Sequence, residues 1–190
     1  MMSRTFDEDL KQAVSFHGHL CAGQIIGTRI ARIALRYFEI EDPDSYRDLV
    51  AFVEADRCLA DALTSVAGCH IGKRRLKWHD FGKMAASFYD MNAKKAIRIA
   101  SKNFEKAKPG EDLVEFFNQF SDEEMFRIQE VELELTEYDL PGSPKVHVVC
   151  ESCGEHVLDN RHVEKDGKIL CKACAGEPLY YQVIGELQGV

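Results

Sequence analysis

The sequence predicts an α+β fold for a main domain, residues 1–145, followed by a small metal-stabilised domain, residues 146–190. Helical and strand patterns are mixed along the chain without a regular βαβ alternation, which is typical of α+β proteins. Apolar residues recur at helical spacing between Leu20 and Phe38, and they alternate with charged residues from Phe126 to Leu135. We therefore expect packed helices and an antiparallel sheet in the main domain.

The first predicted element is a long amphipathic helix from Leu20 to Phe38. Isoleucines and Tyr37 repeat on one side of this segment, and arginines occupy the other side. The apolar stripe is expected to be part of the core. A short buried strand at Leu49–Val53 and a helix at Cys58–Val66, stopped by Gly68, come next.

The second half of the main domain is predicted to be mostly strands. Strands lie between Lys77 and Ile99, with a turn at Met91–Lys94. A helix at Glu111–Phe120 follows a Pro-Gly pair. The alternating strand from Phe126 then has a bulge at Gln129–Glu130, where the alternation shifts.

The domain boundary is expected within Thr136–Lys145, where two prolines, a glycine and a serine interrupt the apolar pattern. The residues before this segment are enough for one hydrophobic core. The residues after it are too few to fold without a bound metal. This division gives the two domains, 1–145 and 146–190.

Composition limits the classes of function. The net charge of −8 argues against a nucleic-acid-binding surface over the whole molecule, because phosphate contacts need clustered lysine and arginine. The N-terminal residues include Asp7, Glu8 and Asp9 and no apolar stretch, so we expect neither a signal peptide nor a membrane span. A cytoplasmic location is expected, where seven cysteines are more economically explained as metal ligands or reactive thiols than as disulfides.

The last four cysteines form the strongest motif in the chain. Two Cys-x2-Cys pairs are separated by seventeen residues, and each pair can direct two thiolates at one centre. Gly154 after the first pair and the hairpin turn Asp166-Gly167 fit such a zinc module. A pair of disulfides or a rubredoxin-like iron centre is the alternative, and disulfides require an oxidising compartment. The predicted ligands of a structural Zn2+ are Cys150, Cys153, Cys171 and Cys174.

A second group of metal-ligating residues lies just before the long helix, at His17, His19 and Cys21. If the helix begins near His17, then His17 and Cys21 share one face, and the helix dipole favours the thiolate of Cys21. Cys21 is then a metal ligand or a nucleophile. In the alternative interpretation, the two histidines cap a helix and the cysteine is an ordinary core residue.

Two further segments each contain a cysteine near charged residues. Asp56 and Asp61 flank Cys58 at a strand-to-helix junction, and Lys73 follows Cys69 in a glycine-containing turn. We expect these segments to converge on a cleft that holds a second transition metal with an open coordination position. The candidate metal ligands there are His17, His19, Cys21, Cys58 and Cys69. The candidates for cofactor or ligand binding are His17, His19, Cys21, Cys69 and Lys73. The candidates for a catalytic role are Cys58, Asp56, Asp61 and Lys73, as acid/base groups, nucleophile or partners of the ligands.

Three blocks of sequence together resemble the FmdE family, named for the FmdE component of molybdenum formylmethanofuran dehydrogenase. The blocks are FHGHLCAGQIIGTR at 16–29, EADRCLADAL at 54–63 and GCHIGKRRLKWHDFGKMA at 68–85. The resemblance implies an α+β domain, often joined to a C-terminal zinc finger. The family's motif residues carry over to His17, His19, Cys21, Gly23, Asp56, Cys58, Asp61, Cys69, Gly72, Lys73, Asp80, Gly82 and Lys83. The chain departs from the family pattern at Ala22, His70, Arg74 and Arg75.

The function favoured by these observations is a metal-binding protein of the FmdE type. Its cleft would hold a metal and a small anionic or pterin-like ligand, and it would be accessory to a molybdenum or tungsten enzyme of the formylmethanofuran dehydrogenase type. The first alternative is a metal-dependent or thiol enzyme of unknown substrate. The second is a zinc-finger interaction or regulatory module with a protein partner, since the zinc segment lacks the basic stripe of a nucleic-acid binder.

A homodimer is expected, partly because the resemblance implies one. Two apolar segments, Phe126–Leu135 and Leu179–Ile184, also offer surfaces that a second copy could cover.

Overall fold

A five-stranded sheet with strand order β2-β1-β3-β4-β5 forms the centre of the main part of the chain. The computed structural model describes residues 2–103, 106–185 and 187. The chain divides into two units, Met1–Pro141 and Gly142–Val190, and the division falls inside the linker-like segment of the sequence. The sheet strands are β1 (Leu49–Val53), β2 (Leu76–Trp78), β3 (Ala85–Asp90), β4 (Lys95–Ser101) and β5 (Phe126–Val131).

The sheet is mixed, because β1 and β2 are parallel while the other neighbours are antiparallel. Helix α3 (Cys58–Val66) connects β1 to β2, so the chain contains one βαβ unit that the sequence analysis did not anticipate. A parallel neighbour requires such a crossover, whereas a hairpin joins β3 to β4 at the predicted turn. The α+β class is confirmed, with this one parallel pair as the correction.

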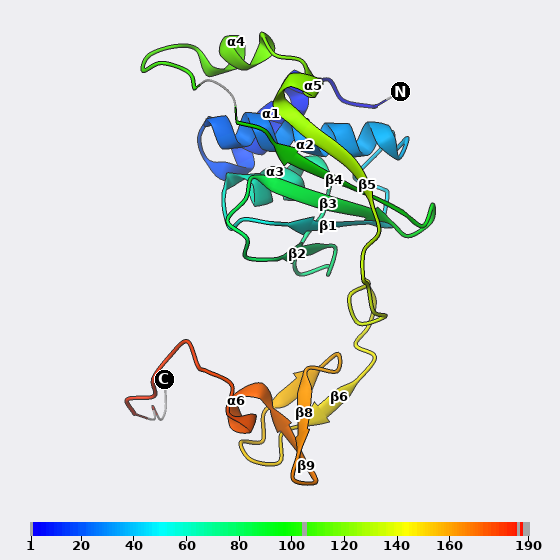
Figure 1. The fold of residues 1–190 in the computed structure, drawn as a ribbon, viewed down its shortest axis with the longest axis vertical. Helices are drawn as coiled ribbons and strands as arrows, with labels where there is room; N and C mark the ends of the chain where they lie inside the picture. The colour runs from blue at the N-terminus through cyan, green and yellow to red at the C-terminus, as the bar shows by residue number, and fades with distance from the viewer. Residues whose placement is uncertain (1, 104–105, 186, 188–190) are drawn as a thin grey trace. The chain divides into compact units, whose positions relative to one another are not determined.

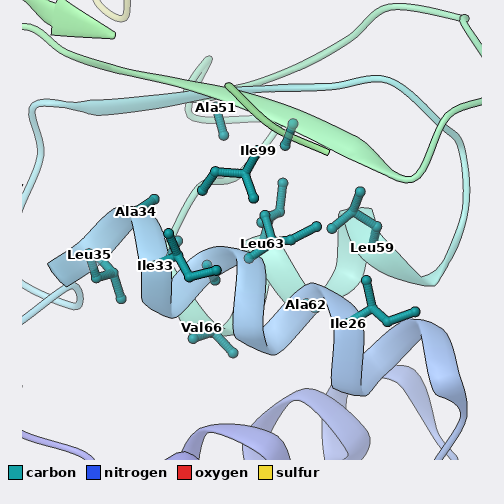
Figure 2. Close-up of a cluster of buried hydrophobic side chains, with 14 of the residues drawn as sticks. Ile26, Ile33, Ala34, Leu35, Ala51, Leu59, Ala62, Leu63, Val66 and Ile99 are labelled. Carbon is teal, nitrogen blue, oxygen red and sulfur yellow. The ribbon is translucent and has the colours of Figure 1, made fainter. Parts of the chain in front are cut away.

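Three helices cover one face of the sheet (Figure 1). They are α1 (Phe6–His17), α2 (Ala22–Tyr37) and α3. Figure 2 shows Ala51 of β1 and Ile99 of β4 directed towards the side chains of α2 and α3. Alternate residues of the strands, such as Phe88, complete this core, which is nearly solvent-free. The isoleucines of the α2 stripe are therefore core, as their periodicity predicts. Tyr37, the last residue of the helix, is the exception, because its side chain is exposed and its hydroxyl donates to Glu130.

Helix α1 was absent from the predictions, although its boundaries carry clear sequence signals. Thr5 and Glu8 form a capping box, in which each side chain bonds the backbone N–H of the other residue. Gly18 ends the helix with a φ of 97°, a conformation that glycine adopts at low cost. The helix therefore stops directly after His17, and this stop determines the geometry of the turn that follows.

The arginines on α2 are structural. Arg29 donates to Asp122 and to the carbonyl oxygens of Phe117 and Phe120, at 2.8–2.9 Å. Arg32 pairs with the fully buried Asp9 of α1. These contacts fasten α1 and the segment containing α4 (Leu113–Asn118) and α5 (Asp122–Met125) onto α2. Their charge is neutralised within the fold, so this stripe is not a free anion-binding surface.

Strand β5 forms one edge of the sheet. Its ladder with β4 runs without interruption from the Ser101–Phe126 pair to the Ala96–Val131 pair. The predicted bulge at Gln129–Glu130 is therefore wrong, and the shift in alternation reflects the solvent exposure of most of this edge strand. Leu133 and Leu135 lie beyond the end of the strand.

The second unit contains two hairpins and a short helix. Strands β6 (His147–Val149) and β7 (His156–Leu158) form the first hairpin, and β8 (His162–Lys165) and β9 (Lys168–Cys171) form the second. Helix α6 spans Lys172–Ala175. Asp166 and Gly167 both have positive φ, as the predicted hairpin turn requires. Within the described residues, no helix combines the length and the apolar content needed to cross a bilayer.

Candidate metal centres

The four C-terminal cysteines form a cluster of sulfur atoms. All four Sγ atoms lie within 4.8 Å of one another, and those of Cys153 and Cys171 are 3.9 Å apart. Sulfur ligands at about 2.3 Å from a tetrahedral Zn2+ lie about 3.8 Å apart, so the cluster has the right size for zinc. Backbone N–H groups of Cys171 and Cys153 hydrogen-bond the Cys150 sulfur and lower its pKa to about 6, which favours the thiolate that zinc requires.

The first knuckle of this cluster is shaped by its backbone. Gly154 has a φ of 77°, and its N–H donates to the carbonyl oxygen of Cys150. Cys171 caps α6 by accepting a hydrogen bond from the Cys174 N–H. The two halves of the site thus come from a turn and a helix start, which the Cys-x2-Cys spacing predicts.

A second group of candidate ligands occupies the turn between α1 and α2. One ligand atom each from His17, His19 and Cys21 lies within 4.8 Å of the others. His17 is the last residue of α1 and Cys21 is the N-cap of α2, so the expectation of one continuous helical face is wrong. The left-handed residue Gly18 instead folds the chain back, and the two imidazole rings come to 4.6 Å between centroids.

Asp61 of α3 holds the ring of His17. Its Oδ2 lies 2.8 Å from His17 Nδ1, while Nε2 of the same ring is buried and has no hydrogen-bond partner among the described residues. An ionised carboxylate can only accept, so the proton of a neutral ring lies on Nδ1 and the lone pair lies on Nε2. A carboxylate–histidine pair of this kind orients metal ligands in many metalloproteins.

Cys58 lies on the flank of this group. A Cβ placed on Gly23 would lie 3.2 Å from Cys58 Sγ and 3.7 Å from Cys21 Sγ, so both sulfurs border the same point. Burial, followed by a hydrogen bond with Cys21, raises the pKa of the Cys58 thiol. Cys58 is outside the set of three ligand atoms that lie within 4.8 Å. It therefore adjoins the group as a mainly protonated thiol.

Cys69 does not join the cleft. It is fully buried in the core, where its thiol approaches the carbonyl oxygens of Leu49 and Ala67 at 3.7 and 3.6 Å. Leu49 begins β1 and Cys58 follows the end of that strand, so Cys69 and Cys58 lie at opposite ends of α3. At 1.5 Å per residue, that helix separates them by about 12 Å. The expected convergence of all three cysteines is wrong in this respect.

The charged residues predicted to serve the cleft also lie in different places. Asp61 contacts His17, whereas Asp56 is exposed in the loop before α3. Lys73 is exposed in the turn after Cys69, at the far end of α3 from the histidines. Arg75, one of the departures from the family pattern, is buried and donates to the carbonyl oxygens of Tyr46 and Gly68. These hydrogen bonds give Arg75 a structural role, and its side chain does not line a cleft.

A hollow of about 330 Å³ is lined in part by Ala22, the residue after Cys21. Its apolar walls include Ile26, Leu113 and Phe117, and Lys102 and Lys106 contribute amines. Lys102 also donates to the carbonyl oxygen of Glu123. Nothing in the local sequence pattern marks these lysines as functional. Only the end of β4 brings them beside the first turn of α2.

Fold and site together define a class of protein: an α+β domain with a Cys/His group in a helix–helix turn, joined to a four-cysteine zinc finger. The sequence model of the FmdE family, described as "Molybdenum formylmethanofuran dehydrogenase operon", matches residues 16–138. The chain belongs to the FmdE family. The prokaryotic dksA/traR C4-type zinc finger matches residues 144–178, so the second unit is a zinc finger.

Two known proteins are similar over most of the chain. A probable S-adenosyl-L-methionine-binding protein of Archaeoglobus fulgidus is 28% identical, over 93% of this chain and 54% of its own length. The chain thus spans about half the length of this curated relative. The crystal structure of a tungsten formylmethanofuran dehydrogenase FmdE-like protein from Syntrophus aciditrophicus matches with a TM-score of 0.57 and 22% identity. That match covers 92% of this chain and 94% of the other, and it supports the fold.

Proposed function

We propose that the first unit of this metal-binding FmdE family protein holds a second transition-metal ion through His17, His19 and Cys21. The observation that carries the proposal is the buried and unpartnered Nε2 of His17, whose lone pair is set by Asp61. An unpaired buried nitrogen costs about 1–3 kcal/mol unless something binds it. One ligand atom each of His17, His19 and Cys21 lies within 4.8 Å of the others, so a metal ion held by this group would give the buried nitrogen a partner.

Two imidazoles and one thiolate suit Zn2+, and Fe, Ni and Cu also accept this ligand set. Three protein ligands leave a coordination position for water or a ligand, as in catalytic zinc sites. Such an ion would supply Lewis-acid chemistry. Within the chain, Asp61 keeps the proton on His17 Nδ1, and Cys58 provides either a fourth ligand or a protonated thiol next to Cys21.

We further propose that a small anionic or pterin-like ligand occupies the hollow beside this centre. Ile26, Leu113 and Phe117 can pack against a ring, and the amines of Lys102 and Lys106 can pair with an anionic group. The ligand in the name of the A. fulgidus relative is not assigned to this chain, because about half of that protein lies outside the matched region.

The family also suggests a biological role, which we propose here. An accessory or cofactor-handling role for a molybdenum or tungsten formylmethanofuran dehydrogenase-type system is supported by the family's description and by the name of the structural relative. We propose this role for the intact protein. Co-purification of the tagged chain with such an enzyme from cells that express both would support it, and separate elution at physiological salt would contradict it.

The metal centre is tested by elemental analysis of the intact protein, purified without affinity nickel or added metal. We expect two metal ions per chain in the wild type and one in His17→Gln and Cys21→Ser. Cys69→Ser is the matched control, because this thiol lies in the core and its loss should leave the count at two. The same metal count in the wild type, His17→Gln and Cys21→Ser, after refolding with Zn2+, Fe2+ and Ni2+ in turn, would overturn the proposal.

One observation favours an enzyme as the second candidate: the sulfur atoms of Cys58 and Cys21 border the same point, so a second thiol lies beside the three-ligand group. Such a thiol could transfer a proton to a substrate held at the metal. A Cys58→Ser variant that keeps both metals separates the two candidates. An enzyme would lose turnover in this variant, whereas a binding protein would keep its ligand affinity.

A homodimer remains part of the proposal. The apolar side chains of Ile128 on β5 and of Leu179–Ile184 are exposed in the single chain, as a surface covered by a second copy would be. Light scattering that gives a mass near 43 kDa, about twice the 21.5 kDa of the chain, would support the dimer, and a mass of one chain would exclude it.

A further inference from the structure

Two histidines of the zinc finger lie in direct contact on one face of its first hairpin. His147 Nε2 is 2.7 Å from His156 Nδ1, and the ring centroids are 4.7 Å apart. In the strand register, His147 is opposite Leu158 and His156 is opposite Val149. The two histidines are thus diagonal neighbours across an antiparallel ladder, and both are exposed to solvent.

The hairpin that carries them is closed by the zinc knuckle. Cys150 follows β6 directly, and its N–H donates to the carbonyl oxygen of Glu155 just before β7. Zinc at the four cysteines therefore fixes the register of β6 and β7. The imidazoles are held together before any second ion binds, which lowers the entropic cost of chelation.

We infer that His147 and His156 form a two-imidazole chelating site for a divalent transition-metal ion, separate from the four-cysteine zinc. Two nitrogen ligands at about 2.0–2.1 Å from a metal lie about 2.9–3.4 Å apart for bond angles between square and tetrahedral. The observed separation is 2.7 Å, so a small rotation of either ring accommodates the ion. When the metal binds, the ring that donates the present hydrogen bond carries its proton on its other nitrogen instead, so both rings coordinate as neutral imidazoles.

The chemistry of the ligands selects the ion. Imidazole nitrogen suits Zn2+, Ni2+ and Cu2+, and affinity at such sites rises towards Cu2+. Both rings face solvent, so the remaining coordination positions are open to water or to a donor from another molecule. The site is thus an exchangeable surface position, unlike the closed cysteine cluster.

The test is a Ni2+ titration of the full, zinc-loaded chain, followed by calorimetry, with His147→Gln and His156→Gln as variants. We expect each single variant to bind Ni2+ at this site at least about tenfold more weakly than the wild type. The reason is that the second imidazole acts at a high effective concentration once the first has bound the ion. The double variant should bind no more weakly than either single variant, since one substitution already removes the chelate. His79→Gln, which changes an exposed histidine of the first unit, should have no effect.

This outcome is independent of the proposed centre in the first unit, because His17→Gln should leave the Ni2+ event of the hairpin intact. Retention of the tightly held zinc at the four cysteines in each variant shows that the finger is still folded. An affinity loss of less than twofold in both single variants would overturn the inference. So would stepwise, additive losses in the single and double variants, and the pair would then be only a surface hydrogen bond.

Discussion

Asp61 Oδ2 lies 2.8 Å from Nδ1 of His17, a residue 44 positions earlier in the chain. The first turn of α3 thereby sets the tautomer of the histidine that ends α1. The other nitrogen of the ring is buried and has no hydrogen-bond partner among the described residues. Three helices thus contribute to the His17, His19 and Cys21 group, and Asp61 orients the His17 ring from α3.

Asp61→Asn should weaken metal binding at His17, His19 and Cys21 by about 10–100-fold, as loss of a carboxylate behind a ligating histidine usually does. An amide can donate to Nδ1, which moves the ring proton to Nε2 and removes the ligand lone pair. Competition with a chromophoric chelator measures the change. Asp56→Asn, an exposed carboxylate in the preceding loop, is the matched control. Equal affinities in the two variants would contradict the role of Asp61.

Gly23→Ala should destabilise the first unit by up to about 2 kcal/mol, because overpacking costs about 1–3 kcal/mol and replacing a helical glycine returns about 1 kcal/mol. The new Cβ would lie 2.8 Å from Cys58 Cβ, which is closer than side chains pack, so the start of α3 must shift. Urea unfolding measures the difference. Gly72→Ala is the control, because a Cβ there meets nothing within 4 Å. A more stable Gly23→Ala variant would show that the approach of α2 to α3 is not constrained.

Cys69 should resist alkylation in the folded protein. Burial raises its pKa to about 12, so thiolate is scarce at pH 8 and the sulfur is inaccessible. Cys21 and Cys58 are partly exposed and should react after metal removal. Mass spectrometry of iodoacetamide-treated protein locates the labels. Labelling of Cys69 at the rate of Cys58 would mean that the core opens readily.

The raised pKa of Cys69 also predicts that the protein loses stability at alkaline pH. The unfolded thiol ionises near pH 9, while the folded thiol holds its proton to about pH 12, so the unfolded state binds fewer protons between these values. The free energy of unfolding should therefore fall as pH rises from 9 to 12. Cys69→Ala should show a shallower fall over this range, whatever its absolute stability. Parallel profiles for the two proteins would refute the assignment.

Removal of zinc should unfold the second unit and leave the first one folded. Few residues of the finger are buried, and among the described ones these are Cys150, Asp159 and Leu170. So small a core cannot offset chain entropy without the metal. Limited proteolysis with and without a chelator measures this outcome. We expect new cleavage sites after Gly142 only, with the first unit protected, and cleavage throughout the sheet would contradict the prediction.

Local sequence signals predicted much of the architecture. The buried strand Leu49–Val53, the helix Cys58–Val66 and the turn at Met91–Lys94 lie where their patterns place them. Helix α1 could also have been found from its capping box and Gly18, which are local features. The parallel pairing of β1 with β2 could not, because a three-residue strand has no pattern that reveals its partner.

The sequence by itself determined the zinc finger, because all four ligands lie in two short segments whose spacing sets their geometry. It also determined the family and the nature of the residues in the α1–α2 turn. Only the tertiary structure decided which distant groups serve that turn: it places Asp61 and Cys58 there and buries Cys69 in the core at the far end of α3. Cys58 and Cys69 have similar sequence surroundings, but the packing of the helices on the sheet places them far apart. That packing depends on contacts throughout the core.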